Sequence, residues 1–446
     1  MSFDQALAYL LSLGHETLTI KLGLRNTERL LAALGDPQEQ FPSVQIAGTN
    51  GKGSTAVMLE SICRQAGVRT GLFTSPHLIR ITERIRINGE EISPSSFARF
   101  TNEVKSAAEE LLVRGELETL PTFFEHVTAI ALLAFREARI ELAILETGLG
   151  GRLDSTTAAG AEVVGITQIA MDHEEYLGHR LREIAAEKAA IIRPGVAAVV
   201  ASQSDEARDV IQRRADQVGV TPVFAEDSEY PQVTSSAPQG GPMRVTFKTN
   251  FETYEDVCLG LRGRHQIENA TTAIALAEGL RARGAPISRE AVIRGLEQAR
   301  HPGRLELWDG EPPILFDGAH NPAAAEGLRA YLDEFVSSPV TMVFGAMRDK
   351  ALSEMAAALF PAAHILILTE IDNPRAARID LLESVVPGEL DRAKIHLARS
   401  PEQALQLAKE LTMSPGLICV TGSLYLVGRT QEILKAAGRD LATQAG

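Results

Sequence analysis

The sequence predicts an α/β protein with mostly parallel strands, arranged in two domains. Short apolar runs of strand length alternate with longer segments whose apolar residues recur at helical spacing, which is typical of β-α-β units. The chain has 446 residues, more than one hydrophobic core normally organises. The stretch His301-Pro302-Gly303 cannot continue a helix, so we expect domains at residues 1–299 and 300–446.

The first domain is predicted to begin its alternation with a strand at 43–47. A glycine-rich turn and a helix at 54–65, ended by Gly67, follow that strand. A further helix is expected at 123–135, and the strands that continue the pattern are expected at 141–145, 163–167, 196–201 and 221–224. Beyond a loop at 235–241, rich in Ser, Pro and Gly, two antiparallel strands are expected on one edge, at 243–247 and 257–261.

Helices predicted at 270–281 and 289–298 lead up to the domain boundary. The second domain then repeats the alternation on a smaller scale. Its predicted strands are at 314–316, 340–344, 363–369 and 417–420, and its predicted helices are at 322–335 and 402–411.

Charge and composition exclude several classes of protein. Lys plus Arg is 44 and Asp plus Glu is 58, giving a net charge of −14, which argues against a nucleic-acid or anionic-membrane partner. The 3 cysteines are far apart and lack metal-ligand spacing. No basic leader opens the sequence, and no apolar run approaches the roughly 18 residues of a membrane span. We therefore expect a cytoplasmic protein.

The strongest local signal is the segment AGTNGKGST at 47–55, between a predicted strand and a predicted helix. Glycines allow backbone N–H groups to approach phosphate oxygens, and a helix N-terminus and Lys52 add positive charge. A hydroxyl from Ser54 or Thr55 suits an accompanying Mg²⁺. The spacing differs from the strict G-x-x-x-x-G-K-[ST] pattern, and the alternative is a tight turn with a surface lysine. The context favours phosphate binding.

Other residues have chemistry that the pattern alone leaves open. Glu146 ends a buried strand, where a carboxylate is either a Mg²⁺ ligand or simply solvent-facing. His173 also follows a strand. Lys188 lies in a helix predicted at 183–192, where packing of its aliphatic stem is the alternative account. Asn269 is expected to start a helix as its N-cap, and Arg304 has a guanidinium suited to phosphates.

The loop Gly48-Thr49-Asn50-Gly51-Lys52 resembles the nucleotide loop of the Mur ligase superfamily. With Gly53-Ser54 it is similar to the folate branch, the folylpolyglutamate synthases and dihydrofolate synthases. Further segments follow in the order of that family. They are Leu22-Gly23-Leu24, Thr74-Ser75-Pro76-His77-Leu78, Phe124-Glu125, LETGLGGRLD at 145–154, Asp172-His173 with Leu177-Gly178, Glu187-Lys188-Ala189, Gly303-Arg304, DGAHNP at 317–322, and Gly422-Ser423-Leu424-Tyr425.

The resemblance implies roles for these residues. ATP would be bound by Gly48, Thr49, Asn50, Gly51, Lys52, Gly53, Ser54, Asn269, Arg304 and Asp317. Ser75 and Glu146 would hold one Mg²⁺ and His173 a second. Lys52, Arg304, His320 and a carbamylated Lys188 would serve catalysis. The folate or pteroate pocket would include Leu22, Gly23, Phe124, Glu125, Arg152 and Asp154, and glutamate would be bound by Arg84, His320 and Ser423.

The implied architecture is an N-terminal P-loop parallel-sheet ATPase domain, which also binds folate, and a smaller C-terminal Rossmann-like α/β domain that acts as the glutamate-ligase domain. The implied activity is Mg²⁺- and ATP-dependent addition of L-glutamate to folates, and to dihydropteroate as well, through an acyl phosphate. A monomer is expected. The chain departs from the family pattern at Ala190, Ala351 and Thr157, where the family tends to have Gly, an acidic residue and Asn.

Three alternatives remain open at this point. The first is a member of the same family with only one of the two activities. The second is a cell-wall Mur ligase, which is disfavoured because the phosphate loop begins near residue 47 and leaves no room for a separate preceding domain. The third is a nucleotide-dependent binding module without ligation, against which Glu146, Asp317 and His320 argue.

Overall fold

The computed structural model describes residues 1–14, 23–227, 229–236 and 242–444. The chain divides into two compact units. Unit 1 comprises Met1–Gln232, Val245–Cys258 and Ile267–Ala299, and unit 2 comprises Val233–Arg244, Leu259–Gln266 and Arg300–Gly446.

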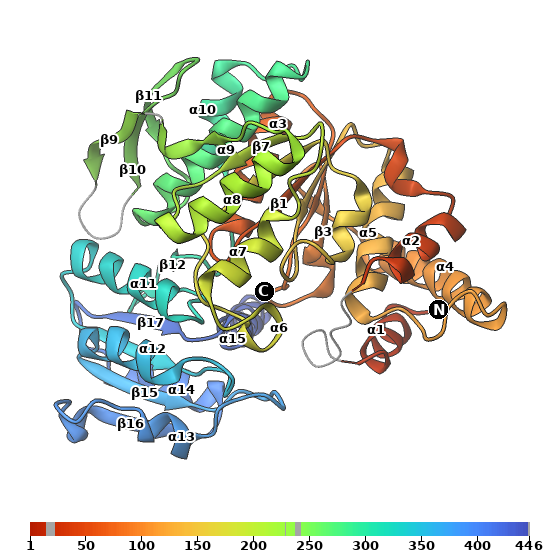
Figure 1. Ribbon diagram of the computed structural model, residues 1–446. Helices are drawn as coiled ribbons and strands as arrows, with labels where there is room; N and C mark the ends of the chain where they lie inside the picture. The colour runs from red at the N-terminus through yellow and green to blue at the C-terminus, as the bar shows by residue number, and fades with distance from the viewer. Residues whose placement is uncertain (15–22, 228, 237–241, 445–446) are drawn as a thin grey trace. The chain divides into compact units, whose positions relative to one another are not determined.

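An eight-stranded sheet is the centre of unit 1 (Figure 1), with the order β4-β3-β2-β5-β1-β6-β7-β8. The strands β2, β5, β1, β6, β7 and β8 run parallel, and β3 and β4 add an antiparallel edge. The bounds are β1 Ser43–Ala47, β2 Thr70–Phe73, β3 Ile85–Ile87, β4 Glu90–Glu91, β5 Leu142–Glu146, β6 Val163–Ile166, β7 Ala197–Val200 and β8 Val223–Phe224.

The helices of unit 1 pack around this sheet. They are α1 Phe3–Ser12, α2 Arg25–Ala33, α3 Lys52–Gln65, α4 Pro94–Val113, α5 Phe123–Ala138, α6 Glu174–Leu177, α7 Leu181–Ala189, α8 Asp205–Val218, α9 His265–Ala282 and α10 Arg289–Gln298. One buried core lies among α1, α2, α4, α5 and strands β2, β3 and β5. A second core lies among α7, α8 and strands β6 to β8.

The predicted elements around the phosphate loop are present. β1 has the expected bounds, and α3 begins two residues before the predicted start. Strand β2 was not predicted, because it is short and contains Gly71. A side chain at Gly71 would meet the ring of Phe135 at 2.6 Å and Ile140 at 2.7 Å, so this glycine allows α5 to approach the sheet closely.

The strand expected at 243–247 is present, but the expected edge position of the two strands and the bounds of the second strand are wrong. β10 Met243–Lys248 and β11 Thr253–Cys258 form a separate three-stranded sheet with β9 Glu229–Ser236, in the order β11-β10-β9. The strand expected at 257–261 therefore begins earlier, and β9 runs into the predicted loop. Asp256 has a φ of 50°, which interrupts the alternation of buried side chains on which the prediction depended.

Two helix bounds also differ from those predicted. α7 ends at Ala189 instead of residue 192, and Pro194, which disfavours a helical conformation of the residue before it, follows five residues later. α9 begins at His265 instead of residue 270, so Asn269 lies within it.

Unit 2 contains a six-stranded sheet with the order β12-β13-β17-β14-β15-β16. All pairs are parallel except β12 with β13. The strands are β12 Glu306–Trp308, β13 Ile314–Phe316, β14 Val340–Phe344, β15 Ile365–Thr369, β16 Ile395–Ala398 and β17 Leu417–Thr421. The helices are α11 Pro322–Phe335, α12 Leu352–Leu359, α13 Ile379–Ser384, α14 Pro401–Leu411 and α15 Leu424–Gln444. The predicted α/β class is confirmed in both units. Within the described residues, no helix combines the length and apolarity needed to span a membrane.

Two helical glycines give a matched test of packing in unit 1. A Cβ at Gly295 of α10 would lie 2.6 Å from the backbone nitrogen of Ile62 in α3, whereas a Cβ at Gly279 of α9 meets open space among the described residues. We expect Gly295→Ala to destabilise the protein by about 1–3 kcal/mol through overpacking. Gly279→Ala should stabilise it by about 0.5–1 kcal/mol, because alanine restricts the unfolded chain. Calorimetric Tm values that shift in the same direction would contradict this account.

Candidate active site

The phosphate loop joins β1 to α3, and two glycines determine its course. Gly48 has a φ of 151° and Gly51 a φ of 86°, both in the region that favours glycine. A Cβ at Gly48 would clash with the hydroxyl of Thr167, and one at Gly51 would clash with the amide oxygen of Asn269. Both positions therefore require glycine for conformational and for steric reasons.

Two lysines donate to the backbone of this loop. Lys52 Nζ lies 3.1 Å from the carbonyl oxygens of both Gly48 and Thr49. Lys188 Nζ lies 2.7 Å from the same Gly48 oxygen. Lys188 is buried, and its burial, together with the nearby Lys52 charge, lowers its pKa to about 7, although Asp172 and Asp154 oppose this shift.

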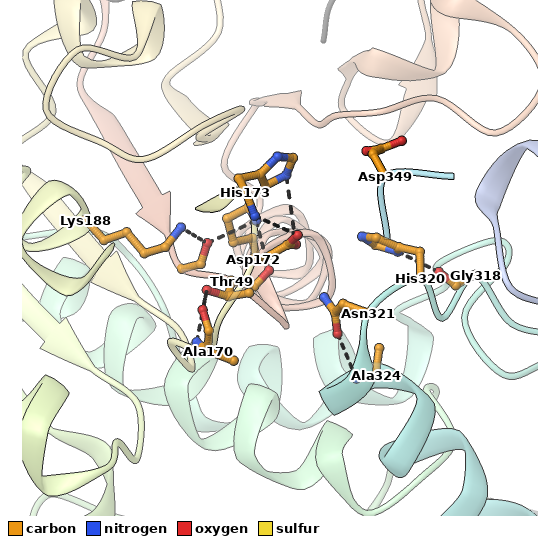
Figure 2. A network of polar contacts seen from close by, with 12 residues as sticks. Thr49, Ala170, Asp172, His173, Lys188, Gly318, His320, Asn321, Ala324 and Asp349 are labelled. Atoms are coloured by element: carbon orange, nitrogen blue, oxygen red, sulfur yellow. Dashed lines mark hydrogen bonds and ion pairs between the residues drawn. The ribbon is translucent and has the colours of Figure 1, made fainter. Parts of the chain in front are cut away.

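The loop is also joined to the segment that follows β6. The hydroxyl of Thr49 donates to the carbonyl of Ala170 at 3.0 Å and accepts from its N–H at 3.1 Å, as Figure 2 shows. Three residues after Ala170, the N–H of His173 donates to Asp172 Oδ1 at 2.9 Å. His173 has a φ of 51°, and its imidazole Nε2 lies 3.9 Å from Asp172 Oδ2. Thr49 therefore joins the phosphate loop to the segment after β6, and His173 lies in that segment as expected.

Glu146 ends β5, which pairs with β1, and its partner in register is Ile46. Its side chain is buried, and Oε2 accepts the N–H of Ser75 at 3.0 Å. The predicted metal ligands Ser75 and Glu146 are therefore in contact. Among the described residues no group of three or more His, Cys, Asp and Glu side chains is arranged to hold a metal. Carboxylate and hydroxyl oxygens nevertheless fit Mg²⁺, which binds through one or two carboxylates together with phosphate and water.

The residues predicted for folate binding differ from one another in their burial and their contacts. Leu22 lies outside the described residues, and Gly23 precedes α2. The half-buried ring of Phe124 packs against Gly148, leaving no room for a Cβ there, and its centroid is 5.8 Å from that of Phe73. Arg152 is largely exposed and pairs with Glu187 at 3.0 Å.

Glu125 and Asp154 are both buried and hold backbone groups. Glu125 Oε2 accepts the N–H of Thr122 at 2.7 Å, and Oε1 accepts the Thr27 hydroxyl at 3.2 Å. Asp154 accepts the N–H of Leu149 at 2.9 Å and that of Thr156 at 3.0 Å. Burial raises the pKa of Asp154, and its hydrogen bonds counter that effect.

Asn269 does not cap a helix as expected. It lies within the second turn of α9, and its amide faces the position of Gly51. The N-cap expectation failed because the helix already begins at the polar residues His265 and Gln266, which look like a loop in the sequence.

In unit 2, several predicted residues gather where β13 ends. Asp317 is buried and accepts the N–H groups of Leu305 at 3.0 Å and Ala319 at 2.9 Å. Burial raises the pKa of Asp317, while the Arg304 charge lowers it. The Gly318 carbonyl accepts from Arg304 at 3.2 Å. It also lies 2.8 Å from His320 Nδ1, a contact that Figure 2 draws. A carbonyl can only accept, so neutral His320 carries its proton on Nδ1 and has Nε2 as the acceptor.

The remaining predicted glutamate ligands lie in separate units. Ser423, in unit 2, is buried at the start of α15, where its hydroxyl accepts the N–H of Tyr425 at 3.2 Å. Arg84, in unit 1, is one of the largest fully buried side chains. Its Nε donates to His77 Nδ1 at 2.9 Å, and its guanidinium lies 5.4 Å from the centroid of the Phe123 ring.

One polar side chain beside this site, that of Gln45, was not predicted from the sequence. Gln45 is fully buried in the middle of β1, and its amide contacts the hydroxyls of Thr156 and Thr157. The sequence feature that could have revealed Gln45 is a polar residue within a strand predicted to be buried.

Comparison with known proteins identifies two domains. Residues 46–277 match the Mur ligase middle domain, and residues 303–424 match the Mur ligase glutamate ligase domain. The chain is 36% identical to the dihydrofolate synthase/folylpolyglutamate synthase of Bacillus subtilis, over 95% of this chain and 97% of that protein. It is also 36% identical to a probable bifunctional folylpolyglutamate synthase/dihydropteroate synthase of Haloferax volcanii, covering 97% of this chain but only 50% of that longer protein.

Solved structures agree with these relatives. The Mycobacterium tuberculosis folylpolyglutamate synthase complexed with ADP has a TM-score of 0.89 and 30% identity, covering 97% of this chain and 99% of that one. E. coli FolC in complex with DHPP and ADP has a TM-score of 0.85 and 31% identity, with 98% of each chain covered. A bifunctional folylpolyglutamate synthase/dihydrofolate synthase with Mn, AMPPNP and L-glutamate bound has a TM-score of 0.83 and 29% identity, again over 98% of each chain. The chain therefore belongs to the Mur ligase family, among its folylpolyglutamate synthase/dihydrofolate synthase ligases.

Proposed function

We propose that this protein uses ATP to join L-glutamate to folates and also to dihydropteroate, with Mg²⁺ as its metal. The observation that carries the proposal is the convergence of Lys52 and Lys188 on the Gly48 carbonyl, in a glycine loop beside the Glu146 carboxylate. A phosphate-binding turn with two cations and an adjacent hard-oxygen ligand suits transfer of a phosphoryl group.

The identities of the substrates are supported by the relatives. One related structure holds DHPP with ADP, and another holds Mn, AMPPNP and L-glutamate. Because both are about 30% identical to this chain over nearly its full length, the same substrates are proposed here. Bifunctionality is supported by the combined name of the Bacillus subtilis relative. We assign nucleotide and folate binding to residues 1–299 and the glutamate-ligase role to residues 300–446.

The proposed reaction has two steps. The substrate carboxylate attacks the γ-phosphorus of ATP, giving an acyl phosphate and ADP. The amino group of glutamate then attacks the acyl carbon, the tetrahedral intermediate releases phosphate, and the amine proton goes to a base or to solvent. In this proposal the loop at 48–54 and Lys52 orient the phosphates, with Asn269 near the loop and Arg304 and Asp317 contributing from unit 2.

The metal would be held by Ser75 and Glu146, with His173 at a second position. When bound, Mg²⁺ supplies positive charge to the transferring phosphoryl group. In the neutral tautomer His320 Nε2 is an acceptor, and in this proposal it receives a proton or orients glutamate together with Ser423.

Lys188 is proposed to act as a carbamate. Its lowered pKa of about 7 leaves a substantial fraction of neutral amine near neutral pH. The neutral nitrogen can add to the carbon of CO₂ and release one proton, which converts a buried cation into an anion. That anion would relieve the repulsion between Lys188 and Lys52.

We further propose that the protein is a cytoplasmic monomer. The three free cysteines, Cys63, Cys258 and Cys419, support a reducing compartment.

The function is tested by measuring ADP release that depends on glutamate, with Mg²⁺-ATP and either dihydropteroate or tetrahydrofolate. We expect turnover with both acceptors, loss of turnover on chelation with EDTA, and recovery when Mg²⁺ is restored. Turnover with one acceptor would refute bifunctionality. ADP binding without any glutamate-dependent turnover would refute the ligase proposal and indicate a nucleotide-binding module.

Carbamylation of Lys188 can be observed directly by ¹³C NMR after equilibration with ¹³C-bicarbonate. The neutral amine reacts and its fraction rises through the pKa of about 7. We therefore expect a carbamate signal that grows from about pH 6 to about pH 8 and disappears in Lys188→Met. Lys105→Met, which removes a partly exposed lysine paired with Glu109, is the matched control and should keep the signal. A spectrum that Lys188→Met does not alter would exclude the modification.

A further inference from the structure

A buried hydrogen-bond network connects the middle of β1 to the loop that follows Glu146. It consists of Gln45 and the four residues Asp154, Ser155, Thr156 and Thr157, all buried. The side chains of Gln45, Asp154, Thr156 and Thr157 hydrogen-bond to one another or to the surrounding backbone, and the Ser155 hydroxyl hydrogen-bonds to that of Thr128.

Hydrogen-bond direction in this network is fixed by its chemistry. The Thr156 hydroxyl donates to Asp154 Oδ1 at 2.6 Å, and the Thr157 hydroxyl donates to the Gly151 carbonyl at 2.6 Å. Each hydroxyl has one hydrogen, so both oxygens are left as acceptors. Gln45 Nε2 supplies them with its two hydrogens, at 3.0 Å from Thr156 and 2.7 Å from Thr157.

Thr156 and Thr157 favour this orientation of the Gln45 amide. If its oxygen and nitrogen were exchanged, the oxygen would face these two hydroxyls, whose hydrogens are already donated, and only the more distant Thr147 hydroxyl, 3.4 Å away, would have a hydrogen to offer. In the observed orientation, Gln45 Oε1 is buried without a hydrogen-bond partner in the described part of the chain. A buried acceptor of this kind is destabilising, so the position of Gln45 is not explained by stability alone.

At one end of the network, Asp154 accepts hydrogen bonds from the backbone of the loop at 147–153. Asp154 accepts the N–H of Leu149 at 2.9 Å, and its carboxylate is also hydrogen-bonded by the backbone of Gly148. Gly148 is the residue on which the Phe124 ring packs. The Ser155 hydroxyl lies 2.9 Å from that of Thr128, which donates to the Phe124 carbonyl at 2.9 Å. Both ends of this network therefore reach Phe124, one through the loop and one through α5.

We propose that Gln45 is a positioning residue for the pteroate side of the site, acting through Thr156 and Thr157 on the loop that supports Phe124 and Asp154. This inference rests on the proposed function. Gln45 and Thr157 form a pair in which the amide is on the strand and the hydroxyl is on the loop.

The test compares Gln45→Met with the wild type in turnover of dihydropteroate, in ADP binding and in thermal stability. Methionine has a similar volume and removes the unpartnered acceptor, so we expect Tm to stay within about 2 °C of the wild type. The KM for dihydropteroate should rise about three- to tenfold, the change expected for one lost hydrogen bond, with the Kd for ADP unchanged. Gln406→Met makes the same exchange at an exposed position of α14 and should leave all three values unchanged.

Variants of Thr156 test the route from Gln45 to the loop. Thr156→Val removes the hydroxyl and should raise the same KM, whereas Thr156→Ser retains it and should restore nearly the wild-type value. If both residues act through one network, the double variant of Gln45→Met and Thr156→Val should show about the KM of the more affected single variant.

An unchanged KM for dihydropteroate in Gln45→Met would overturn the inference. So would a lower Tm accompanied by equal losses of dihydropteroate and ADP binding, because that result indicates a purely structural role. Absence of glutamate-dependent turnover in the wild type would instead refute the proposed function, and this inference with it.

Discussion

The shared Gly48 carbonyl is the interaction on which the site depends. One backbone oxygen accepts hydrogen bonds from Lys52 of α3 and from Lys188 of α7, so two cations are held at the end of β1. That arrangement requires the positive φ of Gly48. It also brings Gly48 so close to the Thr167 hydroxyl that any side chain there would clash. The strand, both helices and the loop after β6 are therefore positioned around a single peptide group.

Local charge at this point contrasts with the charge of the whole chain. The protein carries a net charge of −14, yet two lysines donate to its phosphate loop, and one of them, Lys188 of α7, is buried. Burial and mutual repulsion make the charged form of Lys188 costly, and the acidic Asp172 and Asp154 only partly offset this. A ligand or a modification that adds negative charge here would remove that conflict, which gives a physical reason for anion binding at this loop.

Much of the fold could be predicted from the sequence because its strands are short apolar runs between recognisable helices. β1, the Gly48–Lys52 turn and α3 are local features, and their residues determine them locally. The strand expected at 257–261 was misplaced, since Asp256 breaks the alternation that marks a strand. The start of α9 was also missed, because its first turn is polar.

The site was predictable to the extent that its residues lie at strand ends. Glu146 is the last residue of β5 and His173 lies in the segment after β6, and parallel strands bring their carboxyl ends to one edge. The hydrogen bonds that hold the predicted site residues in place could not be predicted from the sequence. Glu125, for example, caps its own helix and accepts the Thr27 hydroxyl, a pairing across 98 positions of the chain. The network around Gln45 is similarly hidden, because only the fold brings β1 and residues 154–157 together.

The central claim is that Lys188 is a buried amine whose charge is opposed by Lys52. The most direct test is to titrate Lys188 by NMR in protein with labelled lysine, in buffer free of CO₂, using Lys188→Met to assign the signal. The account predicts a pKa of about 7 for Lys188 in the wild type and a higher pKa in Lys52→Met, where the opposing charge is gone. A wild-type value near the ordinary lysine pKa of about 10.4, unchanged by Lys52→Met, would contradict it.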